Sequence, residues 1–96
     1  MSNQEIQDII IHYLKDYKPE YIGIFGSYSR NEDKANSDLD LLVKFKNSIS
    51  LLQLIKIENE LSDKTGIKID LVTEGALKNE TIKKSIQDDL NVIYQA

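Results

Sequence analysis

The sequence predicts a single α/β (α+β) domain in which helices cover a mixed β-sheet in two layers. Three apolar runs have the length and the β-branched or alternating composition of strands, at residues 21–26, 39–45 and 67–73. A helical pattern separates the second run from the third but not the first from the second. Because parallel neighbours need a long crossover and antiparallel neighbours do not, we expect both strand directions in one sheet.

The helices are predicted from apolar spacing and from signals at their ends. Residues 3–17 carry Ile, Leu and Tyr at helical spacing. A second helix is expected to begin after Ser50, the first residue of a capping-box pattern, and to stop at Gly66. A weaker third helix over residues 80–89 and a short edge strand at its end complete the order α-β-β-α-β-α-β.

Composition limits the class of protein. The 96 residues allow one domain, 1–96, with a small core. The net charge of −4, with lysines interleaved among acids, disfavours direct nucleic-acid binding, which needs clustered cations. The chain has no cysteine, which removes thiolate catalysis and cysteine-ligated zinc. It also has no signal-peptide pattern and no apolar run of roughly 18 residues, so we expect a cytoplasmic protein without a membrane segment.

Two aspartates stand at the start of the second strand, where the composition of strands disfavours them. Asp38 and Asp40 are two residues apart, so their side chains should leave the same face about 7 Å apart. Like charges held this close repel unless a cation compensates them. Oxygen ligands suit Mg²⁺. The pair therefore indicates either a metal site or a solvated strand end.

A third acid, Asp70, lies in the middle of the run at 67–73. If that strand pairs beside residues 39–45, three carboxylates converge on one sheet face. Such a set suits a two-metal phosphoryl-transfer site. The alternative is a salt bridge from Asp70 to Lys68 or Lys44.

A Gly-Ser turn follows the first strand. Gly26 and Ser27 can aim free backbone N–H groups and a hydroxyl at phosphate oxygens, although ordinary turns have the same composition. Arg30 is the only arginine and can pair with a phosphate in a bidentate manner, or with Glu32 or Asp33.

As a set, these residues resemble a known family. Gly26-Ser27, ten intervening residues and the segment from Asp38 to Asp40 are similar to the GS-x10-DxD pattern of the DNA-polymerase-β-like nucleotidyltransferase superfamily. Asp70 matches the third carboxylate of that superfamily. The short length is most similar to its minimal nucleotidyltransferase (MNT) domains. Members often have Gly after the loop arginine, where this chain has Asn31.

The resemblance implies a polymerase-β-like nucleotidyltransferase core that uses ATP with Mg²⁺, as two ions. The carboxylates would hold the metal and the turn would hold the phosphates. The implied site residues are Asp38, Asp40, Asp70, Gly26, Ser27 and Arg30. In this reading Asp70 also helps to deprotonate the acceptor.

The resemblance also implies a biological role. MNT proteins of this size resemble antitoxins that transfer AMP to a tyrosine of a HEPN ribonuclease toxin and form a hetero-oligomer with it. Two alternatives stay open: an antitoxin that only occludes its partner, and a subunit that modifies a small molecule such as an aminoglycoside.

Overall fold

A computed structural model of the protein describes residues 3–26, 39–76 and 79–96. Its elements follow the predicted order. They are α1 (Asn3–Leu14), the 3₁₀ turn η1 (Lys15–Tyr17), β1 (Pro19–Phe25), β2 (Leu39–Phe45), α2 (Leu51–Thr65), β3 (Ile69–Thr73), the 3₁₀ turn η3 (Glu74–Ala76), α3 (Glu80–Asp89) and β4 (Asn91–Gln95).

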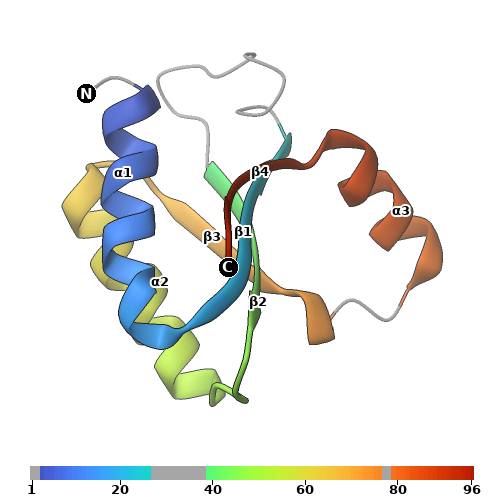
Figure 1. The fold of residues 1–96 in the computed structure, drawn as a ribbon, viewed down its shortest axis with the longest axis horizontal. Coiled ribbons are helices and arrows are strands. Elements are labelled where there is room, and N and C mark those ends of the chain that lie inside the picture. The colour runs from blue at the N-terminus through green and yellow to red at the C-terminus, as the bar shows by residue number, and fades with distance from the viewer. Residues whose placement is uncertain (1–2, 27–38, 77–78) are drawn as a thin grey trace.

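The strands form one four-stranded sheet in the order β3-β2-β1-β4. β1 is antiparallel to β2 and β4, and β2 is parallel to β3. α1 and α2 lie together on one side of this sheet and α3 lies on the other, as Figure 1 shows. The predicted mixed sheet with a helical layer is confirmed.

The element boundaries differ from the predicted ones where the backbone changes direction. The first helix was expected to reach Tyr17, but α1 ends at Leu14 and continues as η1. Lys18 then adopts φ 54, and its N–H donates to Lys15 O at 3.1 Å. This left-handed residue turns the chain so that Pro19 opens β1, a position where a missing N–H is tolerated.

Both predicted ends of α2 are confirmed. Ser50 Oγ accepts a hydrogen bond from Gln53 N at 3.2 Å, which satisfies one of the free amides of the first turn. Gly66 ends the helix at φ 74, with its N–H donating to Ser62 O. β3 begins at Ile69 rather than at Ile67.

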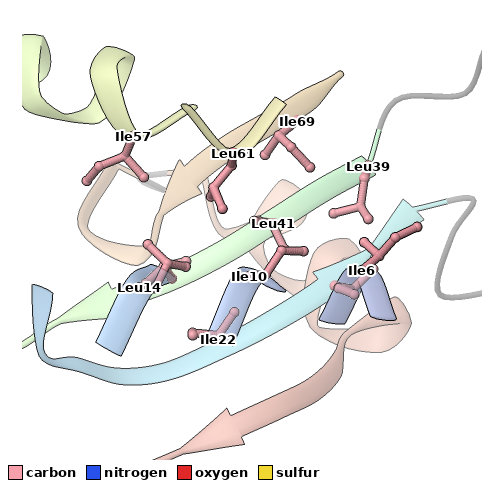
Figure 2. Close-up of a cluster of buried hydrophobic side chains, with 11 residues drawn as sticks. Ile6, Ile10, Leu14, Ile22, Leu39, Leu41, Ile57, Leu61 and Ile69 are labelled. Atoms are coloured by element: carbon pink, nitrogen blue, oxygen red, sulfur yellow. The ribbon is translucent and has the colours of Figure 1, made fainter. Parts of the chain in front are cut away.

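The core fills the space between the two helices and the sheet. Figure 2 shows α1 and α2 contributing side chains that meet those of the central strands. The buried apolar residues of this cluster are Ile6, Ile10, Leu14, Ile22, Ile24, Leu39, Leu41, Val43, Ile57, Leu61 and Ile69. In β2 they occupy alternate positions, so the residues between them, beginning with Asp40, are directed to the opposite face.

That opposite face is covered near its middle. Leu42 is only 1% exposed although it points away from the main core. Its cross-strand neighbour, Gly23, lies so close to Leu90 that a Cβ at position 23 would stand 2.4 Å from Leu90 Cδ1. Leu90, the residue that follows α3, therefore packs against β1 in the space that a side chain at position 23 would occupy. None of the helices in the described ranges is long and apolar enough to span a membrane.

Candidate active site

Three segments distant in sequence meet at one end of the sheet. In the strand register, Asp40 lies opposite Phe25 of β1 on one side and opposite Asp70 of β3 on the other. Gly26 directly follows Phe25. The structure thus brings together Gly26, Asp40 and Asp70, which we call the acidic end of the sheet.

The two carboxylates of the acidic end share a face. In-register residues of neighbouring strands project to the same side, with backbones about 4.8 Å apart. Asp40 is half-buried and Asp70, on the edge strand, is exposed. The strand over residues 69–73 does pair beside β2, which was the condition for the carboxylates to converge, and the pairing places the side chain of Asp70 next to that of Asp40.

Gly26 is fitted closely to Asp40. Its φ of 78 lies in the left-handed region, where glycine is favoured. A Cβ at this position would stand 2.5 Å from Asp40 Oδ2. The chain therefore passes the carboxylate at a distance that no side chain would allow.

The other predicted site residues, Asp38, Ser27 and Arg30, lie outside the described residues. Within the described ranges, no group of three or more His, Cys, Asp or Glu side chains gathers as a metal site. The Asp40–Asp70 pair nevertheless fits a divalent cation, because two adjacent carboxylates supply hard oxygen ligands and need a compensating charge. Asp38 was the predicted third ligand.

The outer side of β3 is held by α2. Glu58 Oε2 accepts a hydrogen bond from Leu71 N at 2.9 Å, and Ser62 Oγ accepts one from Ile69 N at 3.0 Å. These amides flank Asp70. The sequence analysis did not select either side chain, because both stand within an ordinary helical pattern. Their spacing of four residues was the one available signal.

The same sheet face has different chemistry about 13 Å further along β2, the distance that four strand residues span. Lys44 Nζ lies 3.2 Å from Glu20 Oε2, and Tyr21 OH donates to Glu74 Oε2 at 2.6 Å. We call these four residues the paired end. The proposed salt bridge from Lys44 to Asp70 is therefore wrong, since Lys44 pairs with Glu20. A hollow of about 560 Å³ opens beside Lys44 and Glu74.

Ionisation at the paired end follows these contacts. Burial, together with the hydrogen bond to Glu74, raises the pKa of Tyr21 above its ordinary value. The hydrogen bond and charge of Glu20 raise the pKa of Lys44. Both groups therefore keep their protons, and the acids beside them are satisfied within the protein.

A family model described as polymerase beta, nucleotidyltransferase matches residues 8–96 of the chain. The chain belongs to this nucleotidyltransferase family. A protein adenylyltransferase, MntA of Thermococcus cleftensis, is 36% identical over 98 residues, covering 98% of this chain and 96% of the relative. A protein of Methanocaldococcus jannaschii, provisionally named a protein adenylyltransferase, is 48% identical over 90 residues, covering 90% of this chain and 92% of the relative.

Solved structures share the fold. A chain of a toxin–antitoxin crystal structure with AMP-PNP superposes with a TM-score of 0.85 at 22% identity, covering 94% of this chain and 73% of that one. A second solved structure is a complex of a tri-AMPylated HEPN toxin of Shewanella oneidensis with an MNT antitoxin. One of its chains superposes with a TM-score of 0.80 at 20% identity, covering 99% of this chain and 74% of that one. Together with the family model, these shared folds confirm the predicted polymerase-β-like core.

Proposed function

We propose that this chain is a Mg²⁺-dependent protein adenylyltransferase that transfers AMP from ATP to a tyrosine of a partner HEPN ribonuclease toxin and neutralises it as an antitoxin. The observation that carries the proposal is the register of Asp40 with Asp70 beside the close turn at Gly26. A nucleotidyltransferase needs carboxylates and a phosphate-binding turn in this relation, because catalysis depends on position and charge.

The reaction is a single in-line displacement. The tyrosine hydroxyl oxygen bonds to the α-phosphorus of ATP while the bond from that phosphorus to the bridging oxygen of pyrophosphate breaks. Pyrophosphate leaves with the electron pair. In our proposal the hydroxyl proton passes to Asp70, which is exposed and therefore accessible to a protein acceptor.

The chain divides the work among its own residues. Asp40 and Asp70, with Asp38, would hold Mg²⁺, as two ions, which supply positive charge to the triphosphate and the leaving pyrophosphate. Gly26 lets the backbone pass close to Asp40, and Ser27, the next residue in the sequence, would contact the β- and γ-phosphates. Arg30 would add a charged contact to them.

The identity of the acceptor is supported by the relatives. MntA of Thermococcus cleftensis is named for protein adenylylation, and structural neighbours are HEPN–MNT and other toxin–antitoxin complexes. The chain also has an exposed aliphatic cluster at the start of α2. Leu51, Leu52 and Ile55 are 73%, 81% and 46% exposed, which is typical of a surface that a partner covers.

The direct test uses ATP labelled at the α-phosphate, Mg²⁺ and the HEPN protein encoded beside this chain. We expect label on the HEPN protein with the wild-type chain, and its loss in the Asp38→Asn and Asp40→Asn variants. Undiminished labelling in both variants would refute the assigned site. Label on a small molecule instead of the protein would favour an aminoglycoside-like acceptor.

The exposed cluster on α2 gives a second candidate some support, an antitoxin that acts by occlusion alone. The two functions separate in cells that express the toxin. If the Asp38→Asn/Asp40→Asn double variant protects growth as well as the wild type, occlusion is sufficient. If protection is lost while the complex still forms, transfer is required.

A further inference from the structure

β3 is an edge strand whose outer amides are bound by side chains instead of by another strand. Ser62 Oγ accepts from Ile69 N at 3.0 Å and Glu58 Oε2 accepts from Leu71 N at 2.9 Å. Asp70 is the residue between these two amides. The backbone is therefore held on both sides of a carboxylate that the proposed function assigns to metal.

The fit between α2 and β3 follows from their geometry. Four helical residues, from Glu58 to Ser62, advance about 6.0 Å. Two strand residues, from Ile69 to Leu71, advance about 6.6 Å. The two elements run in opposite directions, so one face of α2 can place an acceptor at each outward amide of β3.

The inner side of β3 is held by β2. Leu39 N donates to Lys68 O at 2.9 Å, which shows that Lys68 and, by alternation, Asp70 direct their backbone polar groups toward β2. Ile69 and Leu71 direct theirs outward. The position of Asp70 thus depends on β2 from within and on α2 from outside.

We propose that Glu58 and Ser62 are positioning residues for Asp70, which keep its carboxylate level with that of Asp40. An edge strand with free outer amides frays or shifts register more readily than a strand held on both sides. A shift of one residue would turn Asp70 toward the apolar core and Ile69 or Leu71 toward the acidic end. The proposal rests on the proposed function only where it assigns Asp70 to metal.

The test compares Glu58→Ala with Glu58→Gln, whose amide oxygen can still accept from Leu71. Asp63→Asn is the control, because Asp63 is an exposed acid of α2. Hydrogen exchange of the Asp70 and Leu71 amides is measured in metal-free protein. Mn²⁺ affinity is measured by calorimetry with a non-hydrolysable ATP analogue. Ser62→Ala is a second, smaller perturbation in case Glu58→Ala fails to fold.

In Glu58→Ala we expect exchange of both amides to accelerate about fivefold or more, the effect of losing one hydrogen bond, and Mn²⁺ affinity to fall by a similar factor. Glu58→Gln should recover most of both losses, and Asp63→Asn should match the wild type. Faster exchange at Leu71 alone, with Asp70 exchange and Mn²⁺ affinity unchanged, would overturn the proposal. If the wild-type chain binds no Mn²⁺, the metal assignment fails, whereas Asp70 exchange still decides the positioning role.

Discussion

The two ends of one sheet face each carry two of the acids named above, in different surroundings. At the paired end, Glu20 meets Lys44 and Glu74 meets Tyr21, so each acid has a donor within the protein. At the acidic end, the register places Asp40 beside Asp70, and Gly26 removes the side chain that would push Asp40 away. Adjacent carboxylates cost free energy in the folded protein unless a cation joins them. On this difference we assign the paired end to stability and propose that the acidic end binds the metal and the nucleotide.

The largest effect should come from neutralising the acidic end. Asp40→Asn or Asp70→Asn should lower the rate of AMP transfer at least ~100-fold, because each removes a carboxylate that the proposed reaction uses for charge and position. Glu20→Gln, at the paired end, should leave the rate within about twofold, since an exposed ion pair contributes little. Single-turnover transfer to the proposed HEPN partner measures the rate for all three variants. Equal losses at both ends would remove the distinction between them.

The close approach at Gly26 gives the second largest effect. Gly26→Ala should lower transfer about tenfold or more and the free energy of unfolding by about 1–2 kcal/mol, because a Cβ meets Asp40 Oδ2 and the left-handed backbone disfavours it. Two matched controls separate these causes. Gly66 has a φ of 74 and no atom within 4 Å of a Cβ built on it, so Gly66→Ala should lower the free energy of unfolding without lowering transfer. Gly75 has the same open space without a positive φ, so Gly75→Ala tests neither clash nor strain. Transfer rates and urea unfolding of the three variants separate the effect of the contact with Asp40 from the effect of backbone strain at a positive φ.

The paired end should show its role in stability at alkaline pH. The pKa of Tyr21 is raised in the folded protein, so its contribution is complete below the ordinary pKa of about 10 and is lost as the pH rises above it. Tyr21→Phe should cost about 1 kcal/mol at pH 8, from the lost hydrogen bond to Glu74. The substitution should also make the free energy of unfolding fall less steeply with pH above about pH 10. Urea unfolding across this pH range checks both, and an unchanged alkaline slope would contradict the assignment.

The smallest effect lies away from both ends. Ser50→Ala should lower the free energy of unfolding by about 1 kcal/mol through the lost cap at Gln53 N, with transfer per folded molecule unchanged. Thermal unfolding and a transfer assay at equal folded concentration are sufficient. A loss of transfer per folded molecule would contradict this prediction, and would show that the cap itself, beside the aliphatic cluster of Leu51, Leu52 and Ile55, is needed for contact with the acceptor.

The sequence was sufficient to predict which face carries the acids. Alternation along β2 buries Leu39, Leu41 and Val43 in the core, so the side chain of Asp40 must lie on the opposite face of the sheet. Different local signals, the capping-box pattern at Ser50 and the glycine at position 66, predicted the two ends of α2. These features depend on near neighbours in the chain, and the structure confirms them.

Other features depend on contacts between distant segments. Nothing in residues 67–73 shows that this strand lies at an edge, so the roles of Glu58 and Ser62 could not be predicted. The pairing of Lys44 with Glu20 was likewise missed, because alternation gives the face of a lysine but not its partner on the next strand. Just before the late start of β3, Ile67 N donates to Thr65 Oγ1 at 3.5 Å, beside the end of α2.

The contrast between the two ends can be measured directly with Mn²⁺ as a paramagnetic probe. Substoichiometric Mn²⁺ and a non-hydrolysable ATP analogue are added to isotope-labelled protein, and the broadening of backbone amide signals is followed. Our account predicts that signals of Gly26, Asp40 and Asp70 disappear at the lowest Mn²⁺ level, and that those of Lys44 and Glu74, about 13 Å away along β2, disappear only at higher levels. Broadening centred on Lys44 and Glu74, or equal broadening at both ends, would contradict it.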